Sequence, residues 1–340
     1  MLNGASKPRR QRHGAGNNSD NDSPLLKVQN LGIRFSRANG TTPAVYGLSY
    51  QLGYGRTLGV VGESGCGKTV SALAILGLID PPGEIYTGEV WFEGKELRSL
   101  TQGELAELRG ARIAMVFQEP MTAFNPVYTI GEQISEVTMF HQNLSHAAAQ
   151  SRAIELLDLV RFPSPSKRAH DYPHQLSGGL RQRAMIAMAL AGEPALLIAD
   201  EPTTALDVTL QSQIIELFLE LQNQLKMAIQ FISHDFGVIS EIADEVMVLY
   251  AGRPVEHASA SVLFKNPLHP YTQGLLATVP RLTSNHRRLP TIPGQIPDLT
   301  ALPRGCPFYD RCFMAEPDCA SNEPTFEEVE EKHWVACPKV

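Results

Sequence analysis

The octapeptide GESGCGKT at residues 62–69 constrains this chain more than any other stretch. It fits the pattern Gly-x4-Gly-Lys-Thr, in which a glycine-rich turn lets backbone N–H groups point inward around phosphate oxygens. The apolar run TLGVVG before it predicts a buried strand, and TVSALAILGLI after it predicts a helix. A strand that leads through such a turn into a helix predicts a phosphate site in an α/β fold with a parallel sheet.

Two side chains at the end of this turn have the chemistry that a nucleotide requires. Lys68 is expected to neutralise the β- and γ-phosphates, and the Thr69 hydroxyl to ligate Mg²⁺. Cys66 is either a small packing side chain or a reactive thiol whose pKa is lowered at the helix N-terminus. The candidate ATP-binding residues in this segment are Gly62, Glu63, Ser64, Gly65, Cys66, Gly67, Lys68, Thr69 and Val70.

A second apolar run, ALLIADEP at residues 195–202, ends in two acids. Asp200 is predicted to join Thr69 in holding Mg²⁺, and Glu201 to activate the attacking water as a general base. An apolar strand that ends in acids is often purely structural. Together with the phosphate loop, it indicates a site that hydrolyses a nucleoside triphosphate.

The order of apolar runs predicts how the chain is organised. Two alternating stretches near the N-terminus predict an antiparallel β section, and later strand-length runs separated by helical stretches predict the parallel sheet. Residues from about 119 to 191 read as amphipathic helices and suggest an inserted helical subdomain. We expect a disordered tail at 1–24, a hydrolase domain at 25–255 and an extension at 256–340. A weak contact of the basic tail with anionic lipid or a partner is the alternative to plain disorder.

Composition excludes several classes of protein. The formal net charge is −7, which makes non-specific nucleic-acid binding a poor expectation. The first residues contain no apolar run and so do not resemble a secretory signal, and no stretch reaches the roughly 18–20 apolar residues that span a bilayer. We therefore expect a cytoplasmic chain with reduced thiols.

The segment QLSGGLRQR at residues 175–183 resembles the signature of ATP-binding cassette (ABC) ATPases. In that family the N–H groups of Ser177, Gly178 and Gly179 would grip the γ-phosphate of ATP held by the opposite subunit. The resemblance thus implies that one chain cannot complete a catalytic site. Leu180 stands where glutamine is often found, which leaves the anion-binding backbone atoms unchanged.

Other motifs follow in the order of the same family. Gln118 resembles the glutamine that contacts Mg²⁺ and the attacking water, and His234 the histidine that contacts the γ-phosphate. TTALD, which ends at Asp207, resembles the loop that crosses the dimer interface. The implied catalytic residues are Glu201, His234 and Gln118, and the implied Mg²⁺ ligands are Thr69, Gln118 and Asp200.

An aromatic residue should stack on adenine in a protein of this family. Phe35 is the first choice and Tyr46 its rival, because the RANGTT turn between them obscures the spacing.

Longer segments resemble one branch of the family, the ATP-binding subunits of dipeptide and oligopeptide importers. The resemblance covers residues 25–340 and rests on FQEPMTAFNP, YPHQLSGG, IADEPTTALDVT, NPLHPYTQGLL and LPTIPGQIPDL. It implies a P-loop cassette whose inserted helical subdomain passes ATP-driven motion to membrane permeases through a groove near Gln118, Met121 and Phe124.

The implied partners are a second ATPase subunit (a different chain), two permease subunits and an external peptide-binding protein, with no nucleic acid. The implied location is the cytoplasmic face of the membrane. Nickel, glutathione or another solute is the alternative cargo. A soluble cassette ATPase, acting in DNA repair or translation or carrying a redox-sensing iron–sulfur module, is the alternative class.

Four of the five cysteines lie in the last tenth of the chain. Cys306, Cys312, Cys319 and Cys337 are separated by five, six and seventeen residues, gaps wider than the Cys-x2–4-Cys knuckles of structural zinc sites. Four thiolates match a [4Fe–4S] cluster, and the resemblance agrees because such importer ATPases carry one in this extension. Zinc, disulfides formed on isolation and unligated thiols remain open alternatives, as do a structural and a redox role.

Overall fold

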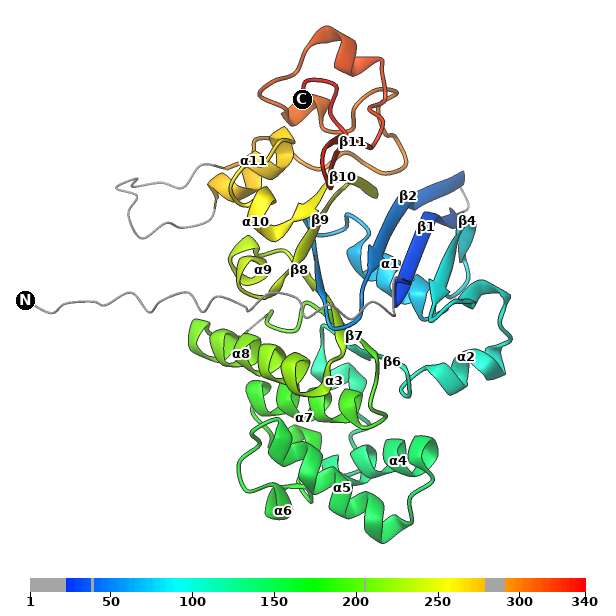
Figure 1. Ribbon diagram of the computed structural model, residues 1–340, viewed down its shortest axis with the longest axis vertical. Coiled ribbons are helices and arrows are strands. Elements are labelled where there is room, and N and C mark those ends of the chain that lie inside the picture. Colours follow the sequence, from blue (N-terminus) through cyan, green and yellow to red (C-terminus); the bar gives the residue numbers. More distant parts are fainter. Residues whose placement is uncertain (1–22, 38–39, 205, 279–290) are drawn as a thin grey trace, which may run out of the picture.

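A sheet of eight strands runs through the molecule in the order β11-β12-β10-β9-β3-β8-β7-β6 (Figure 1). The computed structural model describes residues 23–37, 40–204, 206–278 and 291–340, so nearly all of the tail expected at 1–24 lies outside the described residues. Strands β9, β3, β8, β7 and β6 are parallel, and β10, β12 and β11 continue the sheet antiparallel. The strands are β3 (Thr57–Val61), β6 (Ile113–Val116), β7 (Leu196–Asp200), β8 (Ala228–Ser233), β9 (Glu245–Tyr250), β10 (Arg253–Ser259), β11 (Glu327–Glu330) and β12 (His333–Val335).

The parallel strands form where the sequence has continuous apolar runs, because both faces of this sheet are covered. Every residue of β3, β6, β7 and β8 is buried. Alternate residues enter two different cores: Ile229 and Phe231 of β8 pack in one, and Ala228 and Ile232 in the other. The parallel sheet therefore separates the two hydrophobic cores.

A second sheet, of four antiparallel strands in the order β2-β1-β4-β5, confirms the expected antiparallel β section. It consists of β1 (Leu26–Arg37), β2 (Gly40–Leu52), β4 (Gly83–Phe92) and β5 (Lys95–Glu96). The apolar alternation predicts the first two strands but not β4, whose residues GEIYTGEVWF are only half buried and include a glycine at positive φ.

Helices cover both faces of the larger sheet. Between β6 and β7 the chain leaves the sheet and forms a helical group, which Figure 1 shows at the end of the molecule opposite β11. Among the described residues, no helix combines the length and the apolar character needed to cross a membrane. The helices are α1 (Lys68–Ile75), α2 (Gln102–Leu108), α3 (Pro120–Ala123), α4 (Ile130–Gln142), α5 (His146–Leu159), α6 (Pro165–Arg168), α7 (Gly178–Leu190), α8 (Val208–Leu225), α9 (Phe236–Ile242), α10 (Ala260–Leu263) and α11 (Pro270–Ala277).

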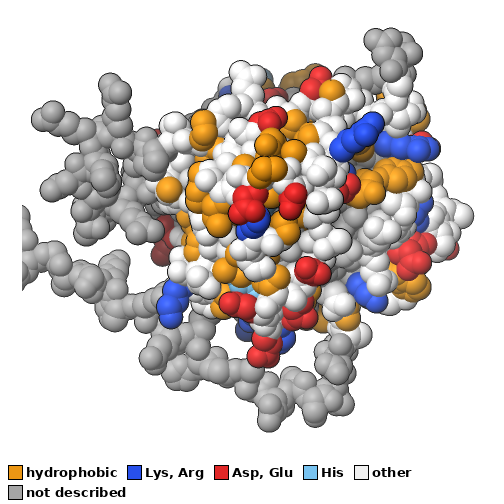
Figure 2. Space-filling model, turned by 90° about the horizontal axis from the view of Figure 1, so that it is seen from above, with side chains coloured by type: hydrophobic (Ala, Val, Ile, Leu, Met, Phe, Trp, Pro, Cys, Tyr) orange, Lys and Arg blue, Asp and Glu red, His pale blue; other side chains and the backbone are white. Residues whose placement is uncertain are grey.

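The C-terminal segment is joined to the sheet through β12, which pairs with β10. The fully buried Glu256 of β10 stabilises this junction: its carboxylate accepts hydrogen bonds from the backbone N–H groups of Leu268 (2.8 Å) and His269 (3.0 Å) and lies 2.8 Å from His333 Nε2. Figure 2 views the molecule from this end and shows acidic side chains scattered among hydrophobic ones. A strand pair and a buried carboxylate thus attach the cysteine-bearing segment to the core.

Candidate active site

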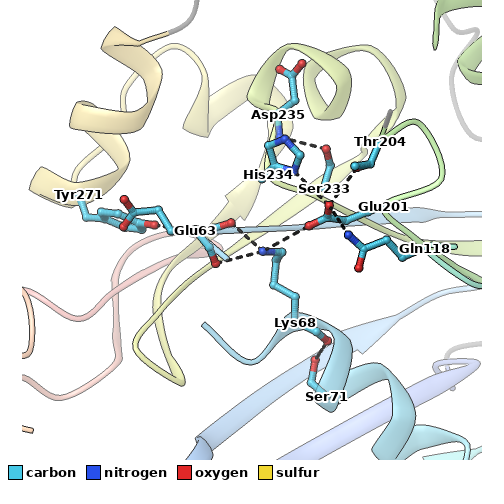
Figure 3. A network of polar contacts seen from close by, with 11 residues as sticks. Glu63, Lys68, Ser71, Gln118, Glu201, Thr204, Ser233, His234, Asp235 and Tyr271 are labelled. Atoms are coloured by element: carbon cyan, nitrogen blue, oxygen red, sulfur yellow. Dashed lines mark hydrogen bonds and ion pairs between the residues drawn. The ribbon is translucent and has the colours of Figure 1, made fainter. Parts of the chain in front are cut away.

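The parallel strands bring the predicted catalytic residues together at their carboxyl ends. The phosphate loop follows β3, Gln118 lies two residues after β6, Glu201 directly follows β7, and His234 directly follows β8. Because parallel strands all end at the same edge of a sheet, residues scattered over more than 160 positions converge there. Figure 3 shows these side chains pointing toward one another above the start of α1.

The backbone of the phosphate loop requires glycine at two positions. Gly67 has φ +96°, and a Cβ atom there would lie 2.6 Å from the carbonyl oxygen of Ala44. At Gly62 a Cβ atom would lie 2.3 Å from the carbonyl oxygen of Leu249. Neighbouring strands therefore press directly on the loop, and only residues without a side chain let it close this tightly.

Lys68 lies at the start of α1 with its side chain only 4% exposed. Its ammonium donates hydrogen bonds to the carbonyl oxygens of Gly62 (2.8 Å) and Glu63 (3.1 Å) and lies 3.8 Å from Glu201 Oε1. A buried positive charge therefore stands between the phosphate loop and the acid at the end of β7. An anion bound in the loop would lie within reach of this charge.

The Glu201 carboxylate is the centre of the polar network. Its Oε2 accepts hydrogen bonds from Thr204 Oγ1 (2.9 Å) and Gln118 Nε2 (3.3 Å) and lies 3.2 Å from His234 Nδ1. The residue adopts φ +45°, a left-handed conformation that is uncommon outside glycine and often marks functional positions. The strained backbone aims a nearly buried carboxylate at the space where a water could be activated.

Asp200 has an unsatisfied oxygen. Its side chain is 2% exposed, and its Oδ1 has no hydrogen-bond partner among the described residues. Burial raises the pKa of this carboxyl group, while a hydrogen bond with the Thr69 hydroxyl lowers it. A buried carboxylate oxygen with no partner, next to a hydroxyl group, is the donor set that a hard cation such as Mg²⁺ prefers.

Cys66 is a packing residue. It is 1% exposed, and burial raises the pKa of its thiol to about 11. The alternative of a reactive thiol with a lowered pKa is therefore wrong: the nearby Lys68 charge favours the thiolate, but burial outweighs it.

The two aromatic candidates for adenine stacking differ in their surroundings. Phe35, near the end of β1, is half-buried, and its ring lies against Gly83, where a Cβ atom would come within 2.6 Å of Phe35 Cε1. Tyr46 is 47% exposed, but the Arg253 guanidinium already lies 4.2 Å from its ring centroid. One face of the Tyr46 ring is thus occupied by this chain's own arginine.

The signature residues lie at the start of α7, with Ser177 at the N-cap position and Gly178 and Gly179 in the first turn. Gly179 lies close to Leu210 of α8, and the carboxylate of Asp207 caps α8 by accepting a hydrogen bond from the Leu210 N–H group (3.0 Å). Leu210 thus contacts both the signature, through its side chain, and Asp207, through its N–H group. The structure does not place Asp207 or the signature among the contacts around Glu201 described above.

The expected permease-facing groove is only partly exposed. Met121 on α3 is 47% exposed, whereas Phe124 is 4% exposed and belongs to the hydrophobic core. Phe124 therefore supports this region from within, and Met121 is the residue that could contact a partner.

All four C-terminal cysteines line one cavity, and all five cysteines of the chain are free thiols. The Cys306 N–H group donates to the Cys319 carbonyl oxygen (2.8 Å), which brings these two loops together. Burial, and to a lesser extent the neighbouring cysteines, raise the pKa of Cys306, Cys312 and Cys337. Within the described ranges, no three His, Cys, Asp or Glu side chains are arranged to hold a single metal ion.

Two residues that contact the phosphate loop are not predictable from the sequence motifs. The hydroxyl of Tyr271 on α11 accepts a hydrogen bond from the Glu63 N–H group (3.0 Å), and the Arg311 guanidinium binds the Glu63 carboxylate. Tyr271 belongs to the NPLHPYTQGLL segment, in which the sequence indicated no contact with the nucleotide site. No local pattern indicates these contacts, because Glu63 and Arg311 are 248 positions apart.

Comparison with known proteins gives consistent results along the chain. Residues 45–204 match the family described as "ABC transporter", and residues 255–319 match "Oligopeptide/dipeptide transporter, C-terminal region". The oligopeptide transport ATP-binding protein OppD of Haemophilus influenzae is 49% identical over 87% of this chain and 92% of its own length. OppD of Bacillus subtilis is 48% identical over 92% of this chain and 87% of its own.

Solved structures agree on the cassette. A dimeric ATP-binding cassette bound to ADP and Pi in a post-hydrolysis state superposes with a TM-score of 0.63 and is 26% identical, over 69% of this chain and 99% of its own. The cbiO1 protein of Clostridium perfringens, part of an ABC transporter complex, gives a TM-score of 0.62 over 72% of this chain. The chain belongs to the ABC transporter ATPases, in the oligopeptide/dipeptide transporter family.

Proposed function

We propose that this chain is the ATP-hydrolysing subunit of a membrane importer and that it couples ATP binding and hydrolysis to the uptake of dipeptides or oligopeptides. The observation that carries the proposal is the Glu201 carboxylate, held by Gln118, Thr204 and His234 at the carboxyl end of the sheet, 3.8 Å from Lys68. The relatives named as oligopeptide transport ATP-binding proteins support peptides as the cargo.

In the proposed reaction, Glu201 takes a proton from the water that attacks the γ-phosphate. Gln118 and His234 hold this carboxylate in place, and His234 also donates to the γ-phosphate. Lys68 and the N–H groups of the loop bind the β- and γ-phosphates, and Phe35 stacks on adenine. Phe35 is chosen over Tyr46 because one face of the Tyr46 ring is already occupied by Arg253.

Mg²⁺ would be held by Thr69, Gln118 and Asp200. Two observations support this donor set: the buried Oδ1 of Asp200 has no hydrogen-bond partner among the described residues, and the carboxyl group of Asp200 is hydrogen-bonded to Thr69. When bound, the ion neutralises negative charge that develops on the phosphates.

The complete catalytic unit is proposed to be a dimer with a second ATPase chain of different sequence. Ser177, Gly178 and Gly179 would bind the ATP held by the partner, and Asp207 would cross the interface. The dimeric cassette to which this chain is similar supports the arrangement. We propose a division into a tail at 1–24, the ATPase domain at 25–255 with its helical subdomain at about 119–191, and an extension at 256–340.

Two permease subunits and an external peptide-binding protein would complete the importer, with this chain at the cytoplasmic face of the membrane. The exposed Met121 supports a contact with a permease through the helical subdomain. Met121→Glu should weaken co-purification with the permeases while ATP binding by the isolated subunit stays unchanged. Phe313→Glu, at a side chain that is 68% exposed in the C-terminal segment, is the matched control.

A [4Fe–4S] cluster is the proposed occupant of the cysteine cavity. Four thiols that line one cavity support it. Bound by these thiolates, the cluster would hold together the loops of the C-terminal segment, which has little hydrophobic core of its own. Anaerobic purification should give a brown protein with about four iron and four sulfide per chain. A colourless protein with one zinc would contradict the cluster.

The transport function is tested on the whole importer, co-expressed with its permeases and reconstituted in liposomes with ATP inside. Addition of the binding protein loaded with a labelled dipeptide should raise both ATP hydrolysis and peptide uptake. Glutathione and Ni²⁺ are tested in parallel. If glutathione or Ni²⁺ is taken up and peptide is not, that solute replaces peptide as the proposed cargo. If ATP hydrolysis responds to none of these solutes, the result favours a soluble ATPase.

A further inference from the structure

The C-terminal segment holds the phosphate loop through an ion pair in which the arginine is buried and the glutamate is about one third exposed. Arg311 Nη1 and Nη2 donate to Glu63 Oε2 (2.7 Å) and Oε1 (2.9 Å), a bidentate arrangement with the guanidinium side chain 4% exposed. Glu63 is the second residue of the loop GESGCGKT, and Arg311 directly precedes Cys312. Two-point pairing fixes the orientation as well as the distance of the carboxylate, which a single contact cannot do.

A second contact holds the backbone of the same residue. The Tyr271 hydroxyl accepts a hydrogen bond from the Glu63 N–H group (3.0 Å), and Tyr271 is fully buried. The Glu63 carbonyl oxygen in turn accepts from Lys68 Nζ (3.1 Å), so Glu63 links the C-terminal half of the chain to the lysine of the loop. Figure 3 shows Tyr271, Glu63 and Lys68 in this sequence.

The guanidinium itself cannot move freely. Its Nε donates to the Pro293 carbonyl oxygen (2.9 Å), and Nη1 also lies 3.3 Å from the hydroxyl of Tyr250, the last residue of β9. Hydrogen bonding to Glu63 is the main reason why the pKa of Arg311 is raised. Because the guanidinium group is held by Glu63, Pro293 and Tyr250, a displacement of the Arg311 backbone would change the position of the Glu63 carboxylate.

The backbone of Arg311 lies in the loop between two cysteines. This residue ends the short 3-10 helix η3 (Tyr309–Arg311), and Cys306 and Cys312 flank that helix. The Tyr309 N–H group donates to the Cys306 carbonyl oxygen (3.0 Å), and the Cys312 N–H group donates to Tyr309 (3.2 Å). A change in what Cys306 and Cys312 bind must therefore move this single helical turn, and with it the backbone of Arg311.

We propose that Arg311 is a positioning residue for ATP binding, which acts through Glu63 to hold the phosphate loop, and that the chemical state of the cysteines beside it sets ATP affinity through this contact. The inference rests on the proposed ATP site and adds a regulatory link to it. Such coupling is reciprocal, so ATP should also protect the cysteine segment.

The first experiment measures binding of a fluorescent ATP analogue with Mg²⁺, and hydrogen exchange of residues 62–68, in the full-length chain purified without oxygen. Arg311→Met should raise the Kd about tenfold, a typical size for coupling between sites, and should speed exchange in the loop. Arg311→Lys keeps the charge without the two-point pairing and should give a smaller rise. Arg161→Met, at an exposed arginine paired with Glu220 far from the loop, is the matched control.

The second experiment tests the link to the cysteines. Cys312→Ser should raise the Kd in the parent chain but by less than twofold in the Arg311→Met chain, because the contact that transmits the change is already lost. In the parent chain, ATP should slow hydrogen exchange across residues 306–312. Independent, additive effects of the two substitutions would overturn the coupling.

The outcomes separate the inference from the function on which it rests. A parent chain that binds no ATP contradicts the proposed function itself. A parent that binds ATP, with a folded Arg311→Met chain of equal affinity, overturns only the role of Arg311. If the Arg311→Met chain does not fold, the Arg311→Lys and Glu63→Gln chains test the role of Arg311 instead. Both should then weaken ATP binding and speed exchange in the loop, and unchanged values in Arg311→Lys would reject the proposal.

Discussion

His234 Nδ1 lies 3.2 Å from Glu201 Oε2, although the two residues are 33 positions apart. The register of the sheet causes this approach: Asp200, the last residue of β7, pairs with Ile232 of β8, and the Glu201 N–H group donates to the Ile232 carbonyl oxygen (3.0 Å). The residues that follow the two strands therefore emerge side by side. The relationship makes Glu201 the first residue to test.

Glu201→Gln should abolish turnover while it preserves ATP binding. The amide has nearly the same shape as the carboxylate and still accepts a hydrogen bond from Thr204, but it cannot take a proton from water. Loss of a general base typically lowers the rate by 10²–10⁴-fold. Phosphate release measures turnover, and equilibrium dialysis measures the Kd for ATP. Glu193→Gln, at a side chain that is 64% exposed, is the control, and a Glu201→Gln chain with more than a tenth of parental turnover would contradict the assignment.

Asp200→Asn should weaken the interaction with Mg²⁺ more than that with ATP. The substitution removes the charge from the buried carboxylate whose Oδ1 has no hydrogen-bond partner in the described part of the chain. We expect the Mg²⁺ concentration for half-maximal ATPase to rise at least about tenfold, in line with losses seen at metal sites. ATP binding measured with EDTA present should stay within twofold of the parent. Asp158→Asn on the exposed face of α5 serves as the control, and an unchanged Mg²⁺ requirement would remove Asp200 from the ligand set.

Cys66 should be alkylated slowly in the folded protein. Burial raises the pKa of this thiol to about 11, so its thiolate fraction at pH 8 is about a hundredfold lower than that of an ordinary cysteine. Iodoacetamide labelling followed by peptide mass spectrometry should show rapid reaction in the urea-unfolded chain and little in the folded one. Equal rates in the two states would show that the loop exposes Cys66.

The stability of the protein should fall on mild acidification because of His269. Burial lowers the pKa of this imidazole from 6.5 to about 3. The unfolded chain thus takes up a proton that the folded one excludes. The stabilisation is complete above pH 6.5 and is lost as the pH falls toward 3, by up to about 1.4 kcal/mol per pH unit.

The comparison of unfolding temperatures at pH 7.5 and pH 5.5 tests this expectation. Asparagine can accept the hydrogen bond that the Tyr271 N–H group gives to His269 Nδ1. The His269→Asn chain should therefore fold but be less stable than the parent at pH 7.5. Its unfolding temperature should fall less than that of the parent between pH 7.5 and pH 5.5. His146→Asn, at an exposed histidine, should keep the parental pH dependence. A His269→Asn chain with the same loss as the parent would assign the pH effect to other groups.

The local parts of the site were predictable from sequence. The apolar runs at residues 57–62 and 195–200 correspond to β3 and β7, and the glycine turn between strand and helix lies where the motif requires it. These features depend on neighbours within about ten residues, and burial on both faces leaves a clear mark of continuous apolar sequence. β4 and β12 leave no such mark, because they are half exposed or only three residues long.

The sequence by itself determined the cassette, the phosphate loop, the acids that follow β7 and the cysteine-bearing end, since each is written in a short contiguous motif. Only the tertiary structure decided that Cys66 is buried, that Phe124 lies in the core and that Arg311 binds Glu63. Burial and pairing depend on which distant segments pack together. Glu63 follows β3 and Arg311 precedes β12, and the pairings of β3 with β9, β9 with β10 and β10 with β12 bring these two segments together across 248 positions, a relationship that no local pattern contains.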